Sequence, residues 1–126
     1  MFHRHLPIAF IASLLAVFVA GGPAPVMADE MNVFIKNLHP RAVVIELFSR
    51  TRDHRWPGDD KVYLLERAEQ KSVVIDCEQG EQICYGAWVN GNDGTYWGVG
   101  PDNNKACDDC CHICVKSSTA EALIGK

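Results

Sequence analysis

Six cysteines constrain this chain more than any other feature, because each one either closes a cross-link or stays a reactive thiol. The chain has 126 residues, and its first cysteine is Cys77. Cys77 and Cys84 flank a glycine-containing turn, and the remaining four, Cys107, Cys110, Cys111 and Cys114, form the motif C-x2-C-C-x2-C. Such spacings indicate disulfides in an oxidising compartment and metal or redox sites in a reducing one. The compartment therefore decides how the cysteines are interpreted.

The N-terminal segment predicts export. Arg4 gives a basic start, residues 6–20 form an uncharged run, and Val26-Met27-Ala28 suits a signal peptidase. We expect residues 1–28 to be a cleavable signal peptide and residues 29–126 to be one domain, periplasmic or secreted. The 15-residue run would span about 22 Å as a helix, short of the roughly 30 Å hydrocarbon core, so we expect no membrane span after cleavage.

Charge and motifs exclude some function classes. Removing the leader with its single arginine changes the formal net charge from −4 to −5. Nucleic-acid binding is therefore not expected, since phosphate backbones are bound by basic patches. The sequence contains no G-x-S-x-G, H-E-x-x-H or P-loop motif, so it offers no support for catalysis.

The hydrophobic pattern of residues 29–126 has a period of two, which is typical of strands. Val43, Ile45 and Leu47, for example, alternate with Val44, Glu46 and Phe48. Strands are predicted at residues 32–37, 42–49, 62–65, 71–77, 82–89 and 95–100. We expect an all-β fold, a small antiparallel sandwich or barrel of about six strands. Residues 106–126 should form an irregular cysteine-rich segment and tail, with a short helix where Ser118 and Glu121 have capping-box spacing.

Six cysteines can form three disulfides in 15 different ways. The sequence excludes some of these arrangements but does not select a single one. Cys110 and Cys111 can bond to each other only through a strained eight-membered ring, so they should have different partners. We expect at least one of Cys77 and Cys84 to bond to the C-terminal cluster and fasten it to the sheet. The alternative joins Cys77 to Cys84 across the hairpin and folds the cluster on itself.

A metal or redox site is the alternative to structural disulfides. Cys107, Cys110, Cys111 and Cys114, with His112 between them, could offer thiolates and an imidazole to Zn or Cu. Structural zinc motifs, however, separate their two C-x2-C knuckles by a dozen residues or more, and here the knuckles abut. Asp108 and Asp109 would raise the thiol pKa that redox chemistry needs lowered. We therefore expect no cofactor.

Aromatic residues and polar loops define the candidate ligand surface. The aromatic set is Trp56, Tyr85, Trp88, Tyr96 and Trp97. Cross-strand packing explains these rings, with Gly86 and Gly98 leaving room for rings on neighbouring strands. The functional interpretation is an exposed platform for a sugar or peptide, edged by polar loops at residues 90–94 and 102–104. A third polar loop, residues 50–60, is expected to carry solvated charges.

Several segments together resemble a family of small, exported, cysteine-rich bacterial proteins without an assigned activity. These are Asn32-Val33-Phe34-Ile35-Lys36-Asn37, Trp56-Pro57-Gly58, Cys84-Tyr85-Gly86-Ala87-Trp88, Tyr96-Trp97-Gly98-Val99-Gly100 and the terminal C-x2-C-C-x2-C motif. The resemblance implies a bacterial periplasmic or secreted setting and transfers no site residue. The sequence thus predicts a disulfide-stabilised module that binds a protein or glycan of the cell envelope, with metal or thiol chemistry at the cluster as the alternative.

Export predicts a defined mature terminus. N-terminal sequencing of the protein recovered outside the cytoplasm should begin at Asp29, because Ala28 is the small residue that precedes the cleavage point. Recovery of a chain that still begins at Met1 would contradict the signal-peptide prediction.

Overall fold

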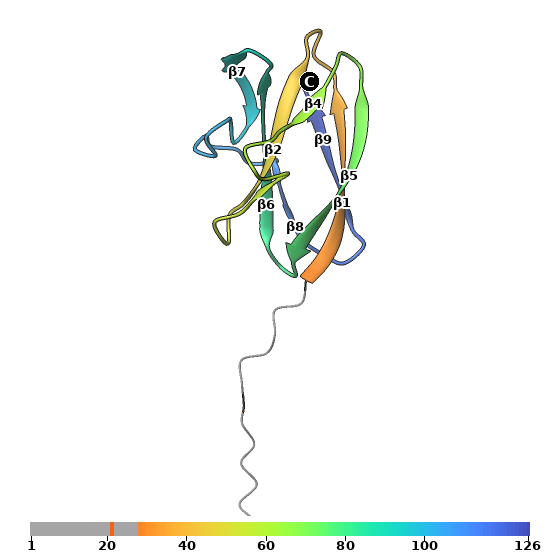
Figure 1. The fold of residues 1–126 in the computed structure, drawn as a ribbon, viewed down its shortest axis with the longest axis vertical. Coiled ribbons are helices and arrows are strands. Elements are labelled where there is room, and N and C mark those ends of the chain that lie inside the picture. The colour runs from red at the N-terminus through yellow and green to blue at the C-terminus, as the bar shows by residue number, and fades with distance from the viewer. Residues whose placement is uncertain (1–20, 22–27) are drawn as a thin grey trace, which may run out of the picture.

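The computed structural model describes Gly21 and residues 28–126, so the predicted leader lies outside the described residues apart from Gly21 and Ala28. In residues 28–126 the chain forms nine strands (Figure 1). They are β1 (Ala28–Asn37), β2 (Val43–Ser49), β3 (Arg55–Trp56), β4 (Tyr63–Leu65), β5 (Gln70–Glu78), β6 (Gln82–Val89), β7 (Asn92–Gly98), β8 (Cys111–Ile113) and β9 (Thr119–Ile124). No helical segment in this part of the chain has the length and apolarity needed to cross a bilayer.

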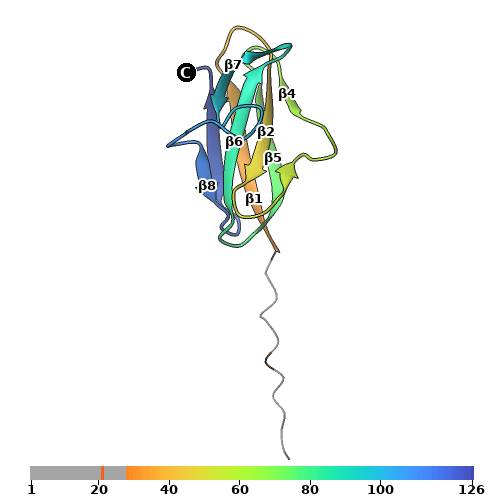
Figure 2. The same ribbon diagram turned by 90° about the vertical axis from the view of Figure 1, so that its left-hand side faces the viewer.

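The strands form two sheets packed face to face, which confirms the predicted all-β sandwich; Figure 1 shows the two layers side by side, and Figure 2 views the six-stranded sheet from its outward face. A three-stranded sheet has the order β5-β1-β9, and a six-stranded sheet has the order β3-β2-β6-β7, with β4 also pairing with β2 and β8 with β6. The six predicted strands correspond to β1, β2, β4, β5, β6 and β7. Prediction missed β3 and β8, which have only two and three residues and no alternation to detect.

The tail is a strand, and the predicted helix is wrong. β9 lies parallel to β1, with Val33 opposite Ala120 and Ile35 opposite Ala122. Ala120, Ala122 and Ile124 are buried at every second position, which a strand allows and a helix does not. The hydroxyl oxygen of Ser118 has no hydrogen-bond partner, so it caps nothing. Pairing with the central strand of the sheet outweighs a capping signal that spans one turn.

The core lies between the two sheets and is made by alternate residues of each strand. Val43, Ile45 and Leu47 of β2 face inward and are at most 2% exposed. From the opposite sheet, Met31, Val33, Ile35, Ile75, Ala120, Ala122 and Ile124 meet them. The inward positions of β2 agree with the alternation read from the sequence, and a one-residue slip would turn the entire set to the outward face.

Two disulfides fasten the C-terminal segment to the sandwich, as expected from the sequence. Cys77 of β5 bonds to Cys114, and Cys84 of β6 bonds to Cys111 of β8. The third bond, Cys107–Cys110, closes a loop between β7 and β8. Cys110 and Cys111 therefore have different partners, as predicted, and the alternative Cys77–Cys84 bond is wrong.

Loop length predicts unequal contributions to stability from these bonds. Cys77–Cys114 joins residues 37 apart, whereas Cys107–Cys110 joins residues 3 apart. Replacing Cys77 and Cys114 by serine should lower the free energy of unfolding by about 4 kcal/mol, and replacing Cys107 and Cys110 by about 2 kcal/mol, because the longer loop restricts the unfolded chain more. Denaturant titration of both double variants measures the difference, and a larger loss from the Cys107 and Cys110 pair would contradict it.

Candidate functional site

The outward face of the six-stranded sheet carries an apolar row that crosses four strands. The pairing register places Leu64 of β4 beside Val44 of β2, Val44 beside Trp88 of β6, and Trp88 beside Tyr96 of β7. We call these four residues the outer aromatic row. Leu64 is 39% exposed and Tyr96 is 42% exposed, whereas Val44 between its neighbours is only 6% exposed. Side chains paired across strands in this way support one another, so the row is held in place by the sheet.

The rest of this face is covered by the loop that follows β7. The backbone of Tyr85 donates to the carbonyl of Cys110 (3.0 Å), and its carbonyl accepts from Val99 (3.0 Å). Under the loop, Phe48, Cys84, Val99 and Cys110 form a second, smaller core on the outward side. The loop therefore covers one half of the face and leaves the outer aromatic row open on the other.

Two glycines allow this loop to approach the sheet. A side chain at Gly86 would collide with the carbonyl of Gly100 and with the Phe48 ring, and one at Gly98 would collide with the carbonyl and ring of Tyr85. Gly98 also has φ +64°, a conformation that other residues rarely adopt. These contacts agree with the expectation that both glycines leave room for rings on neighbouring strands.

Polar groups border the outer aromatic row. A hollow beside Trp88 is lined by Gly91, Asn92 and Asp93 of the β6–β7 turn. On the loop side, the Lys105 ammonium lies 5.1 Å from the centre of the Tyr96 ring, close enough for a cation–π contact. The β6–β7 turn therefore borders Trp88, and Lys105, which follows residues 102–104, borders Tyr96.

A carboxylate adjoins the row on β2. Glu46 faces outward next to Val44 and is 8% exposed, with its Oε2 3.4 Å from Nη1 of Arg55. Burial raises the pKa of Glu46, the charge and hydrogen bond of Arg55 partly oppose that rise, and the charge of Asp60 adds to it. This edge of the row thus offers a hydrogen-bonding group with little access to water.

The other three predicted surface residues do not join the row. Tyr85 pairs with Leu47 and Trp97 with Ala87, so both are on the inward side of their strands. Trp97 packs edge-on against His39, with ring centres 5.1 Å apart. Trp56 is 7% exposed and belongs to the main core. The structure therefore brings Trp88 and Tyr96 together and separates them from Trp56, while Val44 and Leu64 join through sheet pairing that a sequence does not reveal.

The four cysteines of the C-x2-C-C-x2-C motif do not all lie in one cluster. Cys114 bonds to Cys77 at the edge of the other sheet, whereas Cys107, Cys110 and Cys111 stay together. All six sulfurs are in disulfides, and Nε2 of His112 is buried without a hydrogen-bond partner. Within residues 28–126 no group of histidine, cysteine or acidic side chains has the arrangement of a metal site. Three disulfides indicate an oxidising, extracytoplasmic environment.

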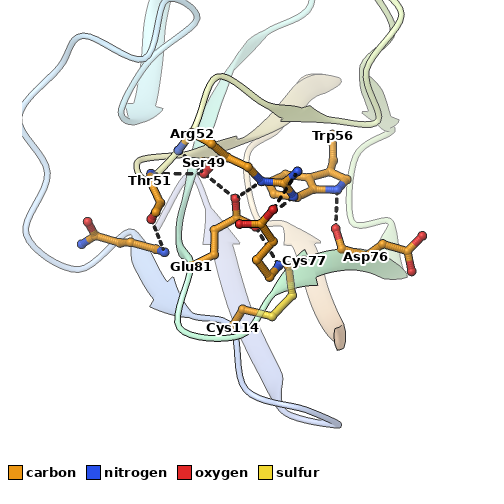
Figure 3. Close-up of a disulfide and its surroundings, with 10 residues drawn as sticks. Ser49, Thr51, Arg52, Trp56, Asp76, Cys77, Glu81 and Cys114 are labelled. Carbon is orange, nitrogen blue, oxygen red and sulfur yellow. Dashed lines mark hydrogen bonds and ion pairs between the residues drawn. A yellow bond between two sulfur atoms is a disulfide. The ribbon is translucent and has the colours of Figure 1, made fainter. Parts of the chain in front are cut away.

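The arginine-rich loop is fixed by a buried carboxylate, so its charges are not all solvated (Figure 3). Glu81, 2% exposed, accepts hydrogen bonds from the Ser49 hydroxyl (2.6 Å), from the Arg52 guanidinium and from the backbone of Glu78 (3.0 Å). Figure 3 shows this cluster next to the Cys77–Cys114 bond, with Trp56 donating its indole proton to the carbonyl of Asp76 (2.9 Å). The loop is thereby anchored to both sheets.

Comparison of the chain with protein-family models, with curated proteins and with solved structures gives no match.

Low pH should reduce the free energy of unfolding by protonating Glu81. Burial by itself would raise the pKa of Glu81, but the hydrogen bonds from Arg52, Ser49 and Glu78 and the charge of Arg52 outweigh it, so the pKa lies below the ordinary 4.5. A pKa lowered by folding contributes stability above the unfolded value, and this contribution is lost as pH falls through the folded value. Glu81→Gln should cost about 1 to 3 kcal/mol at pH 7 and flatten the decline of stability below about pH 4.5.

Urea titrations from pH 3 to pH 7 measure both effects. Asp53→Asn is the matched control, because Asp53 is an exposed carboxylate next to Arg52 in the β2–β3 loop and does not belong to the Glu81 cluster. An unchanged pH profile in Glu81→Gln would show that the cluster contributes nothing to acid sensitivity.

Proposed function

We propose that this protein is an extracytoplasmic binding module, periplasmic or secreted, that holds a neutral oligosaccharide on the outer aromatic row. The observation that carries the proposal is the position of the row on the outward face of a rigid sheet, open to solvent at Leu64 and Tyr96. Disulfides and strand pairing hold the face in one shape, so a ligand would not have to order it, and pre-organisation of this kind favours affinity.

Sugar chemistry suits the row and its border. The flat rings of Trp88 and Tyr96 offer apolar surface to the C–H faces of a pyranose. Both rings also carry a polar N–H or O–H group, which suits a site that is partly exposed to solvent. Asn92 and Asp93 offer donors and acceptors to hydroxyl groups. The formal net charge of −5 after removal of the leader disfavours an anionic glycan, while Asp93 and Lys105 beside the row carry opposite charges.

A protein partner fits the row less well. Stable protein interfaces bury about 800 Å² on each partner. Of the four residues in the row, only Leu64 and Tyr96 are exposed, Trp88 is partly buried, and Val44 is almost covered. The apolar surface open to a partner is therefore small, which favours a ligand that contacts one or two rings and makes hydrogen bonds around them.

Binding should depend on Tyr96 and not on the opposite sheet. In a glycan array followed by titration of tryptophan fluorescence, Tyr96→Ala should weaken binding of the best neutral oligosaccharide about tenfold, because the variant removes one stacking ring. Val74→Ala is the matched control, since Val74 is 65% exposed on β5 of the other sheet and should leave affinity unchanged.

Two outcomes would contradict the proposal. The first is the absence of any fluorescence response to neutral glycans, and the second is equal loss of binding in both variants. Binding of a purified envelope protein that Tyr96→Ala abolishes would keep the face as the binding surface and overturn the sugar assignment.

A further inference from the structure

Two of the three disulfides lie against each other beside an open hollow. Sγ of Cys110 is 3.8 Å from Sγ of Cys111, so the Cys107–Cys110 and Cys84–Cys111 bonds are in contact. The hollow beside them, of about 490 Å³, is lined by Cys84, Cys107 and Cys111 together with Arg50, Gln82, Asn104, Lys105 and Ala106. Its volume is in the range of small-molecule sites. Sulfur and two cationic side chains therefore share one solvent-facing concavity, which adjoins the outer aromatic row through Lys105.

The two bonds differ in how they can be opened. Cys84 and Cys111 are directly opposite each other in the β6–β8 pairing, so strand pairing holds their sulfurs together even after the bond is broken. Each bond has one half-buried sulfur residue that lines the hollow, Cys107 in one and Cys111 in the other, and one fully buried partner, Cys110 or Cys84. A nucleophile arriving from the hollow can therefore reach either bond, but Cys107 lies outside the strands, so no strand pairing promotes reclosure of the Cys107–Cys110 bond.

We propose that the Cys107–Cys110 disulfide is a site of thiol–disulfide exchange with a small dithiol that enters this hollow, while the other two disulfides stay closed. One thiolate of the dithiol attacks Sγ of Cys107, forms a mixed disulfide and leaves the electron pair of the broken bond on Sγ of Cys110. The second thiolate then attacks the reagent sulfur, closes the reagent's own disulfide and leaves the electron pair on Cys107. The dithiol loses two electrons and two protons, and the two cysteine thiols gain them.

Charges around the hollow set the rate of this exchange. Arg50 and Lys105 attract the incoming thiolate and stabilise the negative charge that passes between sulfurs. Asp109 opposes them, because its Oδ1 lies 3.9 Å from Sγ of Cys107. The sequence alone shows Asp108 and Asp109 next to the cysteines, whereas the two cations come from the β2–β3 loop and from the loop after β7.

The exchange does not spread from Cys110 to the other two disulfides, because the geometry around Cys110 disfavours attack on them. The Cys110 thiolate has Sγ of Cys111 within 3.8 Å, but attack there would close the strained eight-membered ring of adjacent cysteines. Cys77–Cys114 has both residues at most 1% exposed and lies at the edge of the other sheet. One disulfide can therefore open while two keep the C-terminal segment attached to the sandwich.

The test follows which cysteines become free when the folded protein meets dithiothreitol. Native protein is treated anaerobically at neutral pH, sampled over time, alkylated and mapped by peptide mass. Alkylation of Cys107 and Cys110 should precede that of the other four cysteines by about tenfold or more in rate. Simultaneous opening of all three bonds, or earlier opening of Cys84–Cys111, would overturn the proposal.

Charge variants test whether the hollow is the route. Arg50→Gln should slow the opening of Cys107–Cys110 by about two- to fivefold and Asp109→Asn should speed it by a similar factor, and both effects should shrink in 1 M salt. Asp53→Asn, an exposed charge in the loop that also carries Arg50, should leave the rate unchanged. Rates that do not respond to either variant would show that the dithiol does not enter through this hollow, and would leave the proposed oligosaccharide binding unaffected.

Discussion

The attachment of the C-terminal segment to both sheets is the constraint on which the rest of the structure depends. Residues 99–124 carry the loop over the outward face, the edge strand β8 and the tail strand β9, and few of these residues would stay in place through local contacts. Cys84–Cys111 ties the segment to β6, and Cys77–Cys114 ties it to β5 in the other sheet. A domain of this size has a limited core, so these covalent links replace burial that a larger protein would provide.

Fixing that segment also defines which surface is available for binding. The loop after β7 covers Phe48 and Cys84 and forms a second core on the outward side of the six-stranded sheet. Lys105 of this loop contacts the Tyr96 ring at the border of the outer aromatic row. The loop therefore covers the part of the face beside the row and supplies part of the row's polar border. The loop after β7 therefore contributes both to the packing of this face and to the proposed binding surface.

Sequence reasoning predicted the elements with strong alternation and missed those defined by their partners. β6 was predicted with its observed bounds, and β2 to within one residue, because both alternate clearly. The capping signal of the tail predicts a helix because it is local, whereas the pairing of the tail with β1 joins residues far apart in the chain. Of the candidate surface residues, Trp88 and Tyr96 lie together, but Trp56 belongs to the core, since aromatic residue type alone does not show the direction of a side chain.

By itself, the sequence determined the all-β class, the inward and outward positions of the main strands and the exclusion of a Cys110–Cys111 bond, because alternation and bond geometry are local properties. Only the tertiary structure decided which cysteines pair, that Cys114 leaves its motif to join Cys77, and that Leu64 and Val44 extend the row formed by Trp88 and Tyr96. The physical reason is that these contacts depend on strand register and sheet packing, which bring distant segments together and are encoded in no single stretch of the chain.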